Sequence, residues 1–168
     1  MKRLYLLRHA TPEPEPSGDD PARALAEAGR AEATEIGARL RALEPAPPLA
    51  LVSSARRAQE TFEALCGGYG SPLPSERTPA LYLASADALL QAIESQDDDR
   101  DALLLVGHNP GIARLAYELL RENEEAGREQ IAVGFTPATL AAISFEVQRW
   151  VEVDRGSGRM IDIARPSI

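Results

Sequence analysis

The chain of 168 residues contains two histidines, His9 and His108, and each lies at the end of a short apolar run. His9 stands beside Arg8 in "LLRHATP", and His108 closes the run in "LLLVGHNPG". A third polar group, Arg56 and Arg57, comes three to four residues after the apolar "LALVS". Arginine forks bind phosphate oxygens in pairs, and an imidazole held between them can attack phosphorus as a nucleophile. These residue types therefore indicate phosphoryl-transfer chemistry, provided that the fold brings the three groups together.

The apolar runs beside these groups have the pattern of short strands that alternate with helices. We expect strands over 2–7, 49–53 and 102–107. The last of these runs, "ALLLVG", is apolar at consecutive positions, which is typical of a central parallel strand covered by helices on both faces. The expected helices are amphipathic and lie over 25–43, from about 58 to the "CGGYG" segment, around 89–93, and over 110–119.

The remaining segments contain shorter patterns that indicate strands or turns. Residues 81–83 are interpreted as a short strand or a turn. Residues 139–145 and 150–153 have the composition of strands, and the tight connection between them predicts an antiparallel hairpin at an edge of the sheet. Residues 160–164 are interpreted as a last short strand.

Several polar residues are assigned to helix ends or packing. Asn109 followed by Pro110 is typical of a helix start, with Asn109 as the N-cap and Pro110 at the first helical position. Ser53 is interpreted as a helix cap, and Thr61 as a packing residue.

Repeated strand and helix units predict the fold class. We expect one α/β domain over residues 1–168, with three α/β/α layers, a mostly parallel central sheet, helices on both faces and an antiparallel edge hairpin. In such sheets ligands bind beyond the carboxyl ends of the strands. Arg8, His9, Arg57 and His108 all follow strand ends, so the fold should gather them at one edge.

Composition limits the classes of partner and compartment. A formal net charge of −8 argues against a general affinity for nucleic acid or an anionic membrane surface, so any anion site must be local. The single Cys66 cannot form an intramolecular disulfide, and no segment has the pattern of a signal peptide or a membrane span, so a cytoplasmic protein is expected. The "GGYGSP" after Cys66 contains no arginine to bind phosphate, which argues against a cysteine phosphatase.

The motifs "LRHATP", "VSSARRAQET" and "LLLVGHNPG", in this order, resemble the histidine phosphatase superfamily, also called the phosphoglycerate mutase-like superfamily. The chain is similar in particular to its short branch of SixA-like protein phosphohistidine phosphatases. The likeness extends to "ALAEAGRAEA" and "FTPATLAAISF", so it covers most of the chain.

The resemblance implies a role for each motif residue. His9 would be the nucleophile that becomes phosphorylated, Arg8 and Arg57 would clamp the phosphoryl oxygens, and His108 would donate a further hydrogen bond and charge. Asn109 is a further candidate for binding phosphate. Arg56 is interpreted as a solvated neighbour or a substrate contact. No metal and no cofactor are expected, because two histidines without a close i,i+4 pairing or a neighbouring cysteine do not form a metal site and arginines repel a cation.

The chain departs from the larger family members that act on phosphate esters, since it has no glutamate in an obvious register to serve as the general acid. Asp87, Glu13, Glu15 and Asp19 are the candidates, and none is preferred. A phosphohistidine substrate needs such an acid less, because its P–N bond is labile.

The sequence therefore predicts a metal-independent phosphatase that acts through a phosphohistidine intermediate on proteins such as histidine-containing phosphotransfer domains. A phosphatase of small phosphate esters is the alternative within the superfamily. A phosphate-binding regulatory module without catalysis is the alternative from another class.

Overall fold

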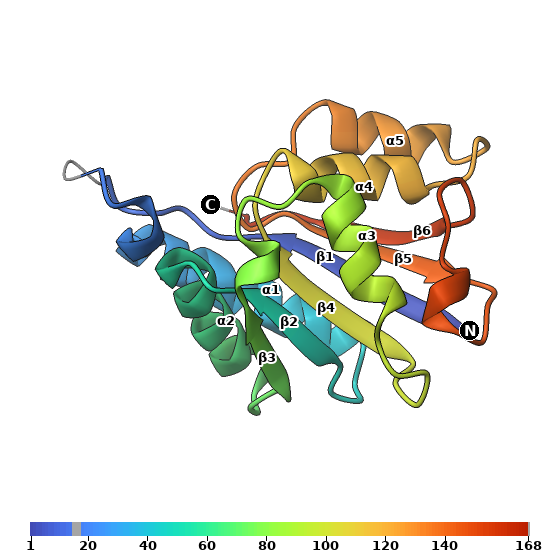
Figure 1. Cartoon of the computed structure of the whole chain (residues 1–168). Coiled ribbons are helices and arrows are strands. Elements are labelled where there is room, and N and C mark those ends of the chain that lie inside the picture. The colour runs from blue at the N-terminus through green and yellow to red at the C-terminus, as the bar shows by residue number, and fades with distance from the viewer. Residues whose placement is uncertain (15–17, 168) are drawn as a thin grey trace.

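A computed structural model describes residues 1–14 and 18–167, and these residues form a three-layer α/β/α domain (Figure 1). The six strands described pair in the order β3-β2-β4-β1-β5-β6. The first four of these are parallel to one another, whereas β5 is antiparallel to both β1 and β6. The strands are β1 (Lys2–Arg8), β2 (Leu49–Ser53), β3 (Ser75–Thr78), β4 (Ala102–Gly107), β5 (Leu140–Phe145) and β6 (Arg159–Ala164). The predicted fold class is confirmed.

Helices cover both faces of this sheet. On one face lie α1 (Glu27–Leu43) and α2 (Arg56–Tyr69), and on the other lie α3 (Ala86–Glu94), α4 (Gly111–Leu119) and α5 (Glu125–Ala132) (Figure 1). The consecutive apolar residues of β1 divide between the two cores, since Leu4 and Leu6 pack on the α3 and α4 side whereas Tyr5 and Leu7 pack on the α1 and α2 side. Burial on both faces is the reason why the central strands show no polar alternation.

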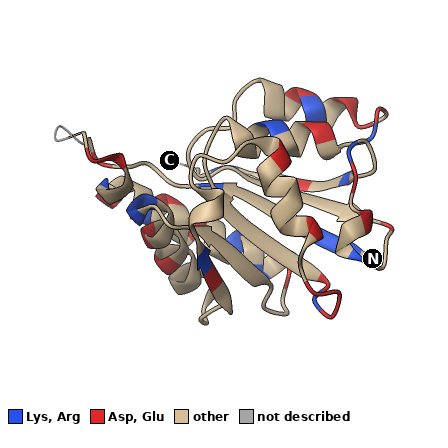
Figure 2. Ribbon diagram, in the orientation of Figure 1, with Lys and Arg blue, Asp and Glu red and all other residues tan. Residues whose placement is uncertain are grey.

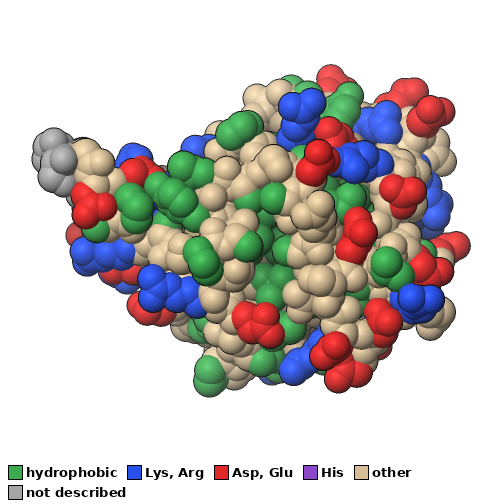
Figure 3. Space-filling view, in the orientation of Figure 1, with side chains coloured by type: hydrophobic (Ala, Val, Ile, Leu, Met, Phe, Trp, Pro, Cys, Tyr) green, Lys and Arg blue, Asp and Glu red, His purple; other side chains and the backbone are tan. Residues whose placement is uncertain are grey.

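Charged residues are carried by the helices, the loops and the strand ends, and the middle strands are almost free of them (Figure 2). On the face seen in Figure 3, acidic side chains are spread widely, with arginines between them. On this face the negative charge is therefore distributed and not gathered into one patch (Figure 3).

Glycines let α1 and α2 approach closely. A Cβ on Gly37 of α1 would lie 2.0 Å from the Leu65 carbonyl oxygen, and one on Gly68 of α2 would lie 1.8 Å from the Thr34 carbonyl oxygen. Only glycine permits this separation. Helix α2 continues through Gly68 and ends at Gly70, whose φ of 93° is the left-handed conformation of a helix C-cap.

The predicted edge hairpin is present, but its second strand was misplaced. β5 pairs with β6, whereas Trp150–Glu152 form a turn of 3-10 helix, so the expected strand over 150–153 is wrong. The reason is the side chain of Trp150, which is fully buried and whose indole N–H donates to the Arg100 carbonyl oxygen at 2.8 Å. An apolar residue that docks as a single anchor was interpreted as part of a strand.

The predicted start of α4 was also wrong. Pro110 takes the N-cap position itself, after a cis peptide bond with Asn109, and the Asn109 side chain makes no cap. Its Nδ2 donates instead to the carbonyl oxygen of Phe135 at 2.8 Å. Residues 81–83 form the end of a 3-10 turn (Pro79–Leu81) and the residues after it, which agrees with the turn alternative.

Candidate active site

The carboxyl ends of β1, β2 and β4 lie side by side, and the residues that follow them line one pocket of about 360 Å³. Its lining is mainly cationic and imidazole side chains. The lining residues are Arg8, His9, Pro12, Asp20, Arg23, Arg57, Leu83, His108 and Asn109. The five candidates Arg8, His9, Arg57, His108 and Asn109 are therefore brought together.

One ring nitrogen of His9 contacts the backbone, and the other faces Arg57. Its Nδ1 lies 2.8 Å from the carbonyl oxygen of Ala10. Because a carbonyl can only accept, Nδ1 carries the proton and Nε2 carries the lone pair. The Arg57 Nε donates to this Nε2 at 3.3 Å. The tautomer therefore presents a nucleophilic nitrogen beside a guanidinium.

His108 has the opposite tautomer. The Arg57 Nη2 lies 3.3 Å from its Nδ1, and a guanidinium can only donate, so Nδ1 accepts and Nε2 carries the proton. That Nε2 lies 2.7 Å from the hydroxyl oxygen of Ser53. The predicted helix cap at Ser53 is wrong, because the N-cap of α2 is Ala55. The Ser53 hydroxyl accepts from the Ala55 N–H at 3.3 Å and also holds His108.

Both imidazoles are neutral at pH 7. Burial, reinforced by Arg57 and Arg8, lowers the pKa of His9 to about 4. Burial, His9 and Arg57 lower the pKa of His108 to about 3. The two ring centres are 5.2 Å apart, so a proton on either ring opposes one on the other. A bound dianion would raise the pKa of His108 and favour a proton on its Nδ1.

Arg57 lies in the first turn of α2 and is 3% exposed. Its Nη1 donates to the carbonyl oxygen of Asp20 at 2.8 Å, and its Nη2 donates to Asp20 Oδ2 at 3.0 Å. The Tyr82 hydroxyl donates to the same carboxylate oxygen. The bonds from Tyr82 and Arg57 lower the pKa of Asp20, so this carboxylate is ionised and pairs with Arg57. Asp20 and Tyr82 are site residues that the sequence analysis missed.

Arg8 and Asn109 share one acceptor. The Arg8 Nη1 donates to the Phe135 carbonyl oxygen at 3.1 Å, and Asn109 Nδ2 donates to the same atom. Within the described residues, Arg8 Nε is buried and has no hydrogen-bond partner. The carbonyl of Phe135, between α5 and β5, therefore orients both side chains. No pattern in the sequence indicates that Phe135 has this role.

The segment between β1 and α1, which carries Asp20, is anchored at both ends. Its anchors are hydrogen bonds from backbone N–H groups to side-chain oxygens of α1 and α2. Ala10 donates to Thr61 Oγ1 at 3.0 Å, Thr11 to Glu32 Oε1 at 3.0 Å, and Leu25 to Glu60 Oε1 at 2.8 Å. Thr61, expected to be a packing residue, is fully buried and also donates to the Arg57 carbonyl oxygen at 2.7 Å.

The candidate general acids that the structure describes, Glu13, Asp19 and Asp87, do not line the pocket. Glu13 and Asp19 are absent from its lining, and Glu15 lies outside the described residues. Asp87 is 80% exposed and forms an ion pair with Arg155. The carboxylate that does line the pocket is Asp20, which neighbours one of the candidates.

Two other residues considered in the sequence lie apart from the pocket. Arg56 is 58% exposed, with its Nε 3.4 Å from Glu60 Oε1, and it lines a separate hollow next to the site. Cys66 lies towards the end of α2, and burial raises the pKa of its thiol, which opposes a nucleophilic role.

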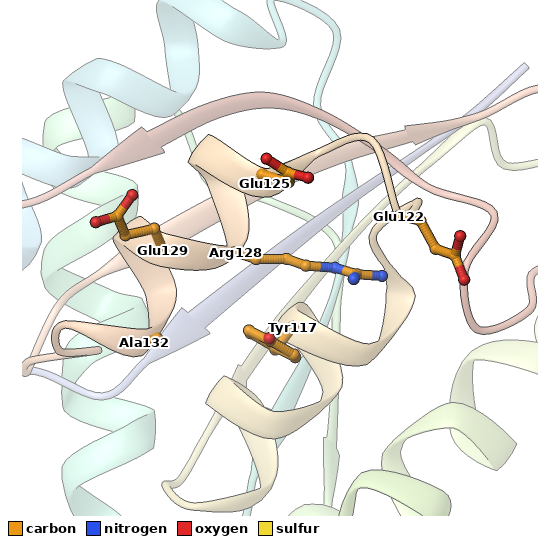
Figure 4. Close-up of a pocket in the computed structure, with 6 residues that line it drawn as sticks. All are labelled: Tyr117, Glu122, Glu125, Arg128, Glu129 and Ala132. Atoms are coloured by element: carbon orange, nitrogen blue, oxygen red, sulfur yellow. The ribbon is translucent and has the colours of Figure 1, made fainter.

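A second hollow, of about 310 Å³, lies between α4 and α5 (Figure 4). Arg128 of α5 reaches over the ring of Tyr117, and its Nη2 donates to the Leu120 carbonyl oxygen at 2.6 Å. None of the candidate residues lies here, and these contacts tie α5 to α4.

No three His, Cys, Asp or Glu side chains in residues 1–14 and 18–167 are grouped so that they could hold a metal ion. In the same residues no helix has both the length and the apolar character needed to cross a membrane.

Comparison with known proteins gives the family. The model of the histidine phosphatase superfamily (branch 1) matches residues 4–82. An uncharacterized protein of Mycobacterium leprae is 30% identical over 141 residues, which are 83% of this chain and 84% of that protein. The chain belongs to the histidine phosphatase superfamily, within its SixA-like branch.

Two solved structures support this placement. A protein from Nakamurella multipartitia, described as a candidate phosphohistidine phosphatase SixA, is 25% identical with a TM-score of 0.86, over 99% of this chain and 97% of that one. Its counterpart from Agrobacterium tumefaciens is 28% identical with a TM-score of 0.81, over 98% of each chain. The chain is therefore a histidine phosphatase, which is a hydrolase of phosphorylated substrates.

Proposed function

We propose that the protein is a metal-independent phosphatase that forms a phosphohistidine at His9 and removes phosphate from phosphohistidine on other proteins. Histidine-containing phosphotransfer domains are the expected class of substrate. The observation that carries the proposal is the orientation of His9, whose unprotonated Nε2 faces Arg57 while its Nδ1 proton is bonded to Ala10.

In the first step, the lone pair of His9 Nε2 attacks phosphorus, and the bond from phosphorus to the leaving atom breaks. Arg8 and Arg57 bind the equatorial oxygens, whose charge their guanidinium groups stabilise. The unpartnered, buried Nε of Arg8 supports this role, because a buried donor without an acceptor costs free energy that a bound phosphoryl oxygen would recover. The negative charge of the bound phosphoryl group favours a proton on Nδ1 of His108. This N–H then donates to a third phosphoryl oxygen.

In the second step, water attacks phosphorus and the P–Nε2 bond breaks. The electron pair returns to Nε2, and His9 leaves as a neutral imidazole because Nδ1 kept its proton throughout. Inorganic phosphate is released. Each step uses only side chains that line the pocket, and arginines at the centre of the pocket disfavour a metal ion there.

The choice of phosphohistidine over an ester as the substrate rests on the protonation state of the carboxyl group that lines the pocket. An ester's leaving oxygen needs a proton donor, whereas the acid that lines the pocket, Asp20, is ionised and paired with Arg57. The name of the SixA-like neighbours, phosphohistidine phosphatase, supports the same choice.

The test is phosphate release in EDTA by the wild type and by His9→Ala, from a histidine-phosphorylated phosphotransfer domain and from a panel of small phosphate esters. We expect rapid release from the protein, slow release from the esters, and a loss of at least about a thousandfold in His9→Ala. Acid-labile, alkali-stable phosphate on His9 after a rapid quench would exclude a module that only binds phosphate.

Faster turnover of an ester than of the phosphoprotein would refute the protein substrate and favour the small-molecule alternative. Activity that disappears in EDTA and returns with a divalent ion would refute the metal-independent mechanism.

A further inference from the structure

The carboxylate of Asp20 lies at the mouth of the pocket with one oxygen open to a ligand. Its Oδ2 accepts hydrogen bonds from Arg57 and Tyr82, whereas Oδ1 is 3.9 Å from Arg23 Nη1, which is beyond hydrogen-bond distance. The side chain is 41% exposed. Among the described residues that line the pocket, it is the one carboxylate.

Apolar groups line the same pocket. Pro12 and Leu83 line it together with Asp20, and Leu83 is 56% exposed. The φ of Leu83 is 47°, a left-handed conformation that costs a residue with a Cβ on the order of 1 kcal/mol. Strained backbone of this kind clusters at active sites and ligand-binding segments. Aliphatic surface beside a carboxylate suits a flat ring that carries an N–H.

The leaving group of a phosphohistidine is such a ring. When the P–N bond breaks, its electron pair goes to the leaving nitrogen. If the other ring nitrogen already carries a proton, the ring departs as neutral imidazole and no acid is needed at the leaving atom. A group that holds a proton on that remote nitrogen therefore replaces the general acid.

His9 has this arrangement on the enzyme's side of the reaction. Its remote nitrogen, Nδ1, is bonded to the Ala10 carbonyl oxygen, so the proton that Nε2 needs for departure is already on the ring. The substrate ring requires an equivalent acceptor on the opposite side of the phosphoryl group.

We propose that Asp20 supplies this acceptor and is the specificity-determining residue for phosphohistidine: its open carboxylate oxygen accepts the N–H of the substrate's remote ring nitrogen. The inference rests on the proposed function and deepens it. An anionic acceptor favours the protonated ring and therefore the better leaving group. A phosphate ester has no remote ring nitrogen, so it gains nothing from Asp20.

The experiment compares the wild type with Asp20→Asn on two substrates, a histidine-phosphorylated peptide and p-nitrophenyl phosphate, whose leaving group needs no proton. Loss of a charged hydrogen bond should lower kcat/KM for the peptide by about 10- to 100-fold. Turnover of p-nitrophenyl phosphate should change much less, because this substrate has no ring N–H for Asp20 to accept. Asp87→Asn is the matched control, since Asp87 is exposed and pairs with Arg155 away from the pocket.

The pH profile provides a readout that a purely structural role would not change. In Asp20→Asn the remote nitrogen should lose its proton at lower pH, so the fall of kcat/KM for the peptide above neutrality should move to lower pH. The groups that face Asp20 across the pocket are Arg8, His9, Arg23, Arg57, Tyr82 and His108. Tyr82, whose pKa its bond to Asp20 raises, stays protonated around neutral pH. Both histidines are neutral there.

Equal losses on both substrates in Asp20→Asn, with an unmoved pH profile, would overturn the role of Asp20 and leave the proposed function standing. A wild type that hydrolyses p-nitrophenyl phosphate but not the peptide would overturn the proposed function, and this inference with it. Thermal unfolding of each variant shows whether a loss comes from misfolding.

Discussion

Lowering the pH from 7 to 5 should destabilise the folded protein through His9 and His108. Their folded-state pKa values of about 4 and about 3 lie below the ordinary value of 6.5. The unfolded chain therefore binds more protons than the folded chain between about pH 3 and 6.5, and the free energy of unfolding falls as the pH drops through this window. At pH 5 each histidine costs about 2 kcal/mol relative to pH 7, or about 4 kcal/mol for both.

Urea unfolding at pH 7 and pH 5 measures this loss, and His108→Gln separates it from the titration of other groups. The variant removes one of the two protonation sites, so its loss between the two pH values should be smaller by about 2 kcal/mol. Inorganic phosphate should reduce the loss in the wild type, because an anion between the rings raises both pKa values. Equal losses in wild type and variant would refute the assignment of two buried, neutral imidazoles.

Three further predictions concern positions that hold the site. Ser53→Ala leaves the Nε2 proton of His108 without its acceptor, so kcat/KM should fall about tenfold while Asp87→Asn stays near the wild type; an unchanged kcat/KM would contradict the assigned tautomer. Thr61→Val removes the acceptor of the Ala10 N–H and should lower the free energy of unfolding by about 1 to 3 kcal/mol in urea denaturation, whereas a neutral effect would mean that this anchor is dispensable. Gly68→Ala should cost about 3 kcal/mol because its Cβ would meet the α1 backbone, whereas Gly67→Ala, with nothing within 4 Å, should stabilise by about 0.5 to 1 kcal/mol; similar effects at the two positions would refute the close helix contact.

The central part of the fold was predictable because its signals are local. β1, β2 and β4 are continuous apolar runs, and Arg8, His9 and His108 stand directly at their ends. Parallel pairing of these strands then brings the residues to one edge without further information.

The features that were missed depend on distant segments. Asp19 and Asp20 are adjacent and chemically identical, and the structure distinguishes Asp20 through Arg57 and Tyr82, which lie far along the chain. β3 has the sequence "SERT", and its residues are mostly exposed at the sheet edge, so it has no apolar pattern.

Asn109 shows how a local rule can fail. Its sequence favours a helix cap, but the carbonyl of Phe135 offers its amide a different partner across the molecule. Trp150 likewise has the composition of a strand residue and is used as a buried anchor.

The anchors of the segment between β1 and α1 bear on how substrate range can evolve. Thr61 and Glu32 fix its beginning next to His9, and Glu60 fixes its end before α1. These three anchors hold the backbone next to His9 and before α1 independently of Asp20. Because Asp20 lies between the anchors, a descendant of this chain would change its leaving-group preference by altering one loop, while the residues that anchor the loop stay under separate selection.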